Sequence, residues 1–167
     1  MSRLRALKFE DASYMMEFIN DAEISSNFKF TRNPFSEDGF KSFIQNSWSD
    51  KNNIHYAIEE KEYSGTISLK NINTVDRTAE YAIVLRKKFW GTGIAKDATE
   101  KIIDYGFNTL NLKKIYLNVL SSNIRANKFY EKMGFKYEGK FTKHVYVNGK
   151  YEDLNWYCVF QEQKEDL

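Results

Sequence analysis

The chain of 167 residues contains one cysteine, one proline and two histidines, and its formal net charge is only +2. The single thiol, Cys158, excludes an internal disulfide framework and a thiolate metal cluster. Nearly balanced charge argues against a nucleic-acid partner, because phosphate contacts need Lys and Arg clustered on one face. Electrostatic nucleic-acid binders are therefore set aside.

Long apolar runs and metal-ligand spacings are also missing. The N-terminal segment alternates apolar and polar residues, which predicts neither a signal peptide nor a membrane span. His55 and His144 lie far apart in the sequence, so we assign no metal. We expect a cytoplasmic protein without a membrane partner. No linker, repeat or low-complexity stretch divides the chain, which favours one domain over residues 1–167.

Hydrophobic residues make up 42% of the chain and aromatic residues 16%, enough for a packed core. Strand patterns occur at 4–9, 55–59, 65–72, 78–85, 114–120, 135–147 and 150–160. Helices are predicted after the capping residues Asp11, Ser36 and Asn123, and over 94–110. The order predicts a mixed α+β fold, with an antiparallel meander over 55–85 and a central strand at 114–120 that is covered on both faces.

One segment, 81–95, runs from a strand through a basic loop with two glycines into a long helix. The first turn of a helix has unpaired N–H groups that bind phosphate, and Arg86, Lys87 and Lys88 would add positive charge. Gly93 is followed by Ile94 rather than by Lys and Ser or Thr, which argues against a nucleotide-triphosphate loop. The alternative is a basic turn in which the glycines only supply unusual dihedrals.

A second segment, 123–135, looks structural when it is considered alone. Asn123 is a good N-cap, and Ala126, Phe129 and Met133 have ordinary core spacing. A single tyrosine on such a helical face, here Tyr130, is usually packed with its hydroxyl bonded. This segment therefore becomes informative only together with the first one.

Together the two segments, Lys88-x-x-Gly91-x-Gly93-x-Ala95 and Asn123-x-x-Ala126-x-x-x-Tyr130-x-x-x-Gly134-Phe135, closely resemble the GNAT superfamily of acetyl-CoA-dependent N-acetyltransferases. The resemblance is strongest to the branch that holds ribosomal-protein alanine acetyltransferases, spermidine acetyltransferases and amino-sugar acetyltransferases. It implies a mostly antiparallel sheet of about seven strands flanked by about four helices. It also implies acetyl-CoA as co-substrate, and a homodimer is one expectation because members of this branch often dimerise.

The resemblance assigns the cofactor contacts. The strands 78–85 and 114–120 would splay apart around the pantetheine arm, which would pair with backbone groups of Ile83, Val84 and Leu85. One strand N–H would face the thioester oxygen and stabilise an oxyanion. At Lys88 the family more often has Gln or Arg. The remaining expected contacts are Lys88, Gly91, Thr92, Gly93, Ile94, Ala95, Lys96, Asn123 and Tyr130.

Acetyl transfer to an amine needs a proton acceptor for the ammonium and a proton donor for the departing sulfur. Tyr130 matches the family's acid, and Glu80 is our choice of base, acting directly or through water. The alternative for Glu80 is a solvated or ion-paired strand residue. Two other classes stay open: an acyl-CoA-binding sensor without catalysis, and a structural module.

The acceptor is expected to be a small-molecule amine. Phe28, Lys29, Arg32 and Tyr56 combine cations with aromatic rings, which favours a nucleotide-linked amino sugar. The same two cations argue against a polyamine, although polyamine and protein N-terminal acceptors remain as alternatives.

Overall fold

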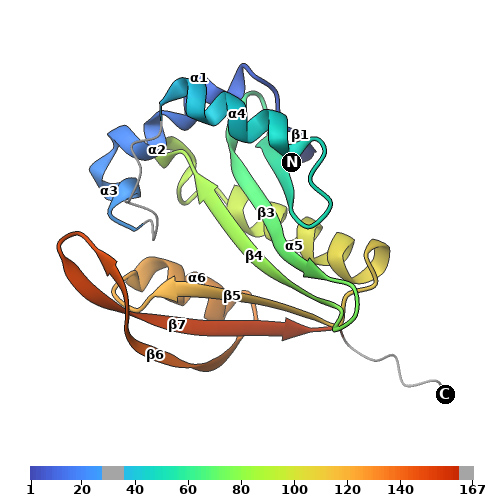
Figure 1. Cartoon of the computed structure of the whole chain (residues 1–167), viewed down its shortest axis with the longest axis vertical. Coiled ribbons are helices and arrows are strands. Elements are labelled where there is room, and N and C mark those ends of the chain that lie inside the picture. The colour runs from blue at the N-terminus through green and yellow to red at the C-terminus, as the bar shows by residue number, and fades with distance from the viewer. Residues whose placement is uncertain (28–35, 162–167) are drawn as a thin grey trace.

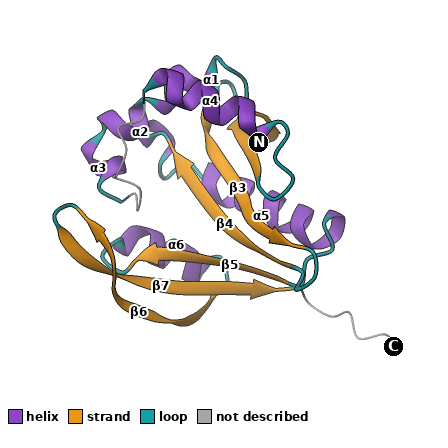
Figure 2. Cartoon of the chain, in the orientation of Figure 1, coloured by secondary structure: helices purple, strands orange, loops and turns teal. Residues whose placement is uncertain are grey.

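The computed structural model describes residues 1–27 and 36–161, and it contains one seven-stranded mixed sheet with helices on both faces (Figures 1 and 2). The strand order is β1-β2-β3-β4-β5-β7-β6. The strands are β1 (Arg3–Ala6), β2 (Ile54–Glu59), β3 (Tyr63–Asn73), β4 (Thr78–Leu85), β5 (Lys114–Leu120), β6 (Lys136–Val147) and β7 (Lys150–Phe160). The helices are α1 (Asp11–Met15), α2 (Glu17–Asn20), α3 (Ala22–Ser25), α4 (Glu37–Ser47), α5 (Ile94–Asp104) and α6 (Ile124–Lys132).

The predicted mixed α+β fold is confirmed, and so is the antiparallel meander, because β2, β3 and β4 pair in that way. The strands predicted at 78–85 and 114–120 have the predicted bounds. Ser36 caps α4 by accepting a hydrogen bond from the backbone N–H of Gly39 at 3.0 Å.

The first helical region differs from the prediction. A single helix capped by Asp11 is wrong, because the chain forms the three short helices α1, α2 and α3. Asp21 interrupts the run by adopting an extended conformation and capping α3 through its carboxylate. The Asp11 carboxylate instead accepts from the N–H of Lys8 at 2.8 Å and binds the guanidinium of Arg5.

The helix predicted over 94–110 also ends differently. Regular α-helix stops at Asp104, and Tyr105–Thr109 continues as one wider turn. The predicted covering of the 114–120 strand is correct for one face only. Ile115, Leu117 and Val119 are buried on the face that carries α5 and α6, whereas Tyr116 and Asn118 on the opposite face are partly exposed.

Two hydrophobic clusters lie on the two faces of the sheet. On the α5 face, Ile94, Ala98 and Ile102 of α5 pack against strand residues, and α6 contributes Tyr130 to the same cluster. On the α4 face, the cluster contains residues of α1 to α4 together with Ala57 and Val84. Because successive side chains of a strand point to opposite faces, the two clusters show on which face of the sheet each of the other strand side chains lies.

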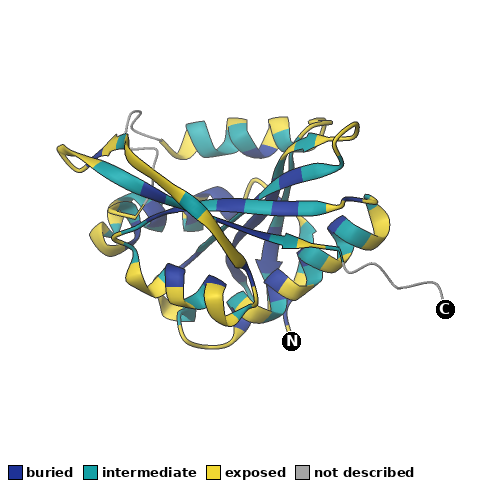
Figure 3. Ribbon diagram, turned by 90° about the horizontal axis from the view of Figure 1, so that it is seen from below, coloured by how far each residue is buried: buried dark blue, intermediate teal, exposed yellow. Residues whose placement is uncertain are grey.

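The two halves of the sheet separate between β4 and β5. These parallel strands pair only at Thr78↔Lys114, Ala79↔Ile115 and Glu80↔Tyr116, and their ribbons then diverge (Figure 1). Beyond this point the facing backbone groups of Tyr81–Leu85 and Leu117–Leu120 lack ladder partners across the gap. The β6–β7 hairpin extends as an arm with long exposed stretches (Figure 3).

Candidate active site

The loop between β4 and α5 presents a helix start without a side-chain cap. Gly91 and Gly93 have φ values of 73° and 87°, a region that other residues rarely adopt. A Cβ atom added at either glycine would meet nothing within 4 Å among the described residues. The first N–H groups of α5 therefore lie in a glycine turn with open space, an arrangement that binds phosphate.

The basic residues of this loop are held by carboxylates. Arg86 is only 5% exposed, and its guanidinium binds both carboxylate oxygens of Glu17 at 2.8 and 2.9 Å. It also donates to Glu62 at 3.0 Å and to the carbonyl of Tyr63 at 2.8 Å. The expectation that Arg86 adds charge at a phosphate site is thus wrong, because this side chain anchors the loop to α2. Lys88 pairs with the same Glu62, and Lys87 pairs with Glu23.

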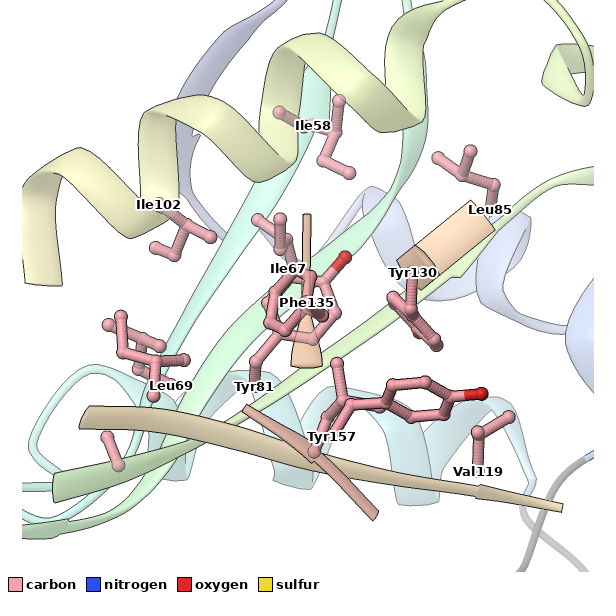
Figure 4. Close-up of a cluster of buried hydrophobic side chains, with 14 of the residues drawn as sticks. Ile58, Ile67, Leu69, Tyr81, Leu85, Ile102, Val119, Tyr130, Phe135 and Tyr157 are labelled. Atoms are coloured by element: carbon pink, nitrogen blue, oxygen red, sulfur yellow. The ribbon is translucent and has the colours of Figure 1, made fainter. Parts of the chain in front are cut away.

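Tyr130 lies over the point where β4 and β5 separate. Its ring stands 5.8 Å from the ring of Tyr81, the first β4 residue beyond the last rung, and 6.2 Å from the ring of Tyr157 (Figure 4). Tyr81 bonds to Thr99, and Tyr157 donates to Asn127, whereas the hydroxyl of Tyr130 has no hydrogen-bond partner among the described residues. Burial raises the pKa of Tyr130, so its phenol stays protonated and able to donate.

Glu80 lies at the same point but on the α4 face. Its carboxylate accepts from the side-chain amide of Asn118 at 3.0 Å and from the ammonium of Lys70 at 2.8 Å. The side chain is 14% exposed. Glu80 is therefore the ion-paired strand residue that the second sequence-based interpretation described, and it also lies at the last paired position before the strands separate, whereas its role as a base stays a prediction.

Other predicted residues take different positions. Asn123 accepts from the N–H of Ala126 at 3.2 Å and caps α6. Tyr56 belongs to the α5 face, where its ring lies 6.0 Å from that of Tyr105, so it does not share a face with Glu80. Phe28, Lys29 and Arg32 lie outside the described residues.

Sequence reasoning missed the residues that hold the site together. Asn127 is buried and donates to the carbonyls of Leu120 and Asn123, which fixes the start of α6 on the end of β5. Its amide oxygen accepts from Asn155 and Tyr157. Asn127 follows Asn123 at helical spacing beside a strand end, which was the only available signal.

The arrangement fits an acyl-CoA group. Unpaired strand edges can hydrogen-bond an extended amide-containing arm, and the uncapped start of α5 can hold a diphosphate. Among the described residues no group of three His, Cys, Asp or Glu side chains is placed to hold a metal ion. No helix in the described ranges is long and apolar enough to cross a membrane.

Known proteins resemble this chain over nearly its whole length. The spermidine N(1)-acetyltransferase of Escherichia coli K12 is 32% identical over 96% of this chain and 87% of its own length. The putative ribosomal N-acetyltransferase YdaF of Bacillus subtilis is 31% identical over 97% of this chain and 92% of its own. The crystal structure of spermidine N-acetyltransferase from Vibrio cholerae in complex with CoA and spermine has a TM-score of 0.86 and 30% identity, and the match covers 96% of this chain and 95% of that one.

The family model described as an acetyltransferase (GNAT) domain matches residues 2–136. With this match and these relatives, the chain belongs to the GNAT acetyltransferase family and is an acetyl-CoA-dependent N-acetyltransferase.

Proposed function

We propose that the protein transfers the acetyl group of acetyl-CoA to a primary amine of a small polyamine such as spermidine, within one ternary complex. The observation that carries this proposal is the placement of Tyr130 and Glu80 on opposite faces of the point where β4 and β5 separate. A proton donor and a proton acceptor thus flank the same gap from two sides.

Acetyl-CoA supplies an activated thioester, whose acyl carbon is open to attack by a neutral amine. The backbone of Ile83, Val84 and Leu85 would pair with its pantetheine arm in the gap. The N–H groups of Gly91 to Lys96 would hold its diphosphate, since the start of α5 has no side-chain cap. Asn123 shapes the opposite side by capping α6.

Glu80 would receive the acceptor. A primary amine of the lysine type has a pKa near 10.4, so it arrives as an ammonium ion and must lose a proton before it attacks. The ammonium of Lys70 already lies 2.8 Å from Glu80, which is the contact that an arriving ammonium would also make. Glu80 is then in place to take the proton directly or through water.

Tyr130 would act at the sulfur. Its hydroxyl is protonated and lacks a partner among the described residues, so it is available to hydrogen-bond the leaving thiolate and to pass on its proton. Tyr130 is largely buried among aromatic rings, and a hydrogen-bond donor in such surroundings contributes more to stabilising a developing charge than it would in water.

The choice of acceptor rests on the relatives. Two of the proteins compared above are spermidine acetyltransferases that match almost the entire chain, and none supports the nucleotide-linked amino sugar that Lys29 and Arg32 suggested. The ribosomal N-acetyltransferase relative makes a protein N-terminus the second candidate.

The test measures release of CoA thiol from acetyl-CoA in the presence of spermidine, a peptide with an N-terminal alanine, or a nucleotide-linked amino sugar. We expect the highest kcat/KM for spermidine, with mass spectrometry showing one added acetyl group. Turnover confined to the peptide or to the amino sugar would remove the polyamine from the proposal. Binding of CoA without turnover of any amine would favour a sensor.

A further inference from the structure

Three aromatic side chains form a row on the α4 face that begins beside Glu80. Tyr116 of β5 is the register partner of Glu80, and its ring centroid lies 6.2 Å from that of Trp156 on β7. Trp156 in turn lies 4.9 Å from Phe141 on β6. We call Tyr116, Trp156 and Phe141 the aromatic shelf.

The three side chains of the shelf are mostly carbon, and their polar atoms are the phenol hydroxyl of Tyr116 and the indole Nε1 of Trp156. Tyr116 and Trp156 are partly exposed, and Phe141 is 48% exposed. The indole Nε1 of Trp156 is buried and has no hydrogen-bond partner among the described residues, so what Trp156 exposes is carbon. Such a surface suits methylene groups and, through the negative faces of its rings, a cation.

Glu80 and the shelf are electrostatically linked. Burial raises the pKa of Tyr116, and the nearby negative charge of Glu80 raises it further. A cation that bridges the carboxylate and the ring of Tyr116 would therefore be attracted by both groups.

Lys70 determines the direction in which a dication extends from Glu80. Its ammonium lies on the β3 side of the carboxylate, in the register pair Lys70↔Glu80. A second positive charge on the acceptor is repelled from that side. On the other side, where β5, β7 and β6 carry the shelf, the ammonium of Lys114 that also acts on Tyr116 is paired with Glu138 at 2.6 Å, so it opposes a second cation less. Neighbouring strands are roughly 4.8 Å apart, so the shelf extends from about 5 Å from Glu80 at Tyr116, through about 10 Å at Trp156, to about 14 Å at Phe141, a range that the further amines of an extended polyamine can reach.

We propose that the aromatic shelf binds the methylene chain and the second ammonium of the acceptor while Glu80 holds the reacting amine. This inference rests on the proposed function and specifies its acceptor: the enzyme selects aliphatic amines that carry a second cation over monoamines. The shelf residues are specificity-determining and do not take part in proton transfer.

The test compares kcat/KM for spermidine with kcat/KM for butylamine in the wild type and in Trp156→Leu and Phe141→Leu. A cation–π contact contributes about 0.5–2 kcal/mol, so the spermidine-to-butylamine ratio should fall roughly two- to thirtyfold in each variant. Trp156→Phe keeps a ring face and should lose less than Trp156→Leu. Tyr151→Leu, which changes an exposed hairpin aromatic outside the shelf, is the matched control and should keep the wild-type ratio.

Calorimetry with CoA separates misfolding from lost specificity, because a folded variant keeps the CoA affinity of the wild type. If Trp156→Leu misfolds, Phe141→Leu alone decides the matter, since its side chain is already half exposed. An unchanged ratio in folded variants overturns the inference while leaving the proposed function intact.

Failure of the proposed function gives a different result. If the wild type acetylates no polyamine, spermidine binding is measured by calorimetry on the CoA complex. Binding that weakens in both shelf variants supports the shelf as a diamine site, and no binding, or equal binding in all variants, overturns it.

Discussion

The ring of Tyr130 stands edge-on to the ring of Tyr81, with centroids 5.8 Å apart and planes at 89°. The two residues come from opposite halves of the divided sheet, Tyr81 from β4 and Tyr130 from the helix that follows β5. Their contact fixes the phenol of Tyr130 over the first unpaired residues of the gap. The hydroxyl of Tyr130 has no hydrogen-bond partner among the described residues, while the hydroxyl of Tyr81 is hydrogen-bonded to Thr99.

Replacing Tyr130 by phenylalanine should lower kcat by roughly a hundredfold or more, because general acid assistance to the leaving sulfur is lost. The ring contacts remain, so affinity for CoA should change little. Thiol release and calorimetry measure the two effects separately. Wild-type turnover in this variant would exclude Tyr130 from the chemistry.

Glu80→Gln should also lower turnover by roughly a hundredfold at neutral pH, since the amide cannot accept the acceptor's proton. The deficit should shrink as the pH rises toward the pKa of the amine, because solvent then supplies the neutral nucleophile. Glu59→Gln, which alters an ion-paired carboxylate on β2, is the control and should keep the wild-type profile. A deficit that is constant with pH would contradict a proton-accepting role.

Gly93→Ala should lower the affinity for CoA, in addition to a modest loss in the free energy of unfolding. Alanine at φ 87° costs about 1–2 kcal/mol, and relief of that strain would turn the first N–H groups of α5 away from a diphosphate. Gly149→Ala imposes similar strain at φ 77° in the distant hairpin turn, so it should cost comparable stability without affecting CoA affinity. Chemical denaturation and calorimetry give both quantities, and equal CoA affinities in the two variants would argue against the glycine turn as the binding site.

Arg86→Met should lower the free energy of unfolding by about 1–2 kcal/mol, chiefly because it leaves the carbonyl of Tyr63 without a donor. The carboxylates of Glu17 and Glu62 also lose their shared partner, but both are partly exposed and Glu62 keeps Lys88. Urea denaturation measures the loss. Lys87→Met removes an exposed ion pair of the same loop and should leave the free energy of unfolding nearly unchanged. Similar losses in both variants would show that the buried hydrogen bonds of Arg86 add nothing to the free energy of unfolding.

We predict that protonation of Asp97 lowers the free energy of unfolding in strong acid. Hydrogen bonds from Ser2, together with Lys101, lower the pKa of Asp97 from 3.8 to about 2. A carboxyl with a depressed pKa stabilises the fold above its unfolded pKa, and this stability is lost as the pH falls from 3.8 toward 2. Because the side chain is about a third exposed, we expect a contribution of about 1 kcal/mol rather than the full value of the shift.

Asp97→Asn should therefore be less stable than the wild type near neutrality and equally stable at the acid end of this range. Denaturant titrations across the range measure the difference. A gap between the two proteins that does not depend on pH would assign the effect to packing instead of charge.

Local sequence patterns predicted most of the fold. Strand-like residue patterns located β4 to the residue, a nearly continuous run of β-forming residues did the same for β5, and Ser36 and Asn123 marked their helices by capping. The division of the first helical region into three short helices was not predicted, because Asp11 and Asp21 are the same residue type and are equally good N-caps on that ground. Only the tertiary position of Arg5 decides that Asp11 serves as an ion-pair partner.

Sequence motifs predicted some residues of the candidate site. Contacts between strands that are far apart in the sequence could not be predicted. The resemblance to the GNAT superfamily singled out Tyr130 and the glycine turn, whereas neither segment was decisive when it was considered alone. The ion pair of Glu80 with Lys70, the burial of Arg86 and the nearness of Trp156 to Tyr116 depend on strand order and register, which join residues far apart in sequence. Tyr56 illustrates the same limit, since a shift of one position along a strand moves a side chain to the other face.

Only three residue pairs join β4 to β5, so the pairing at the centre of the sheet is its weakest. A ligand arm that lies between β4 and β5 would supply the missing backbone hydrogen bonds and connect the two halves of the sheet. Resistance to heat and slow amide exchange at residues 81–85 and 117–120 should then report loading of the protein, because any molecule that binds only the folded form raises its stability by mass action.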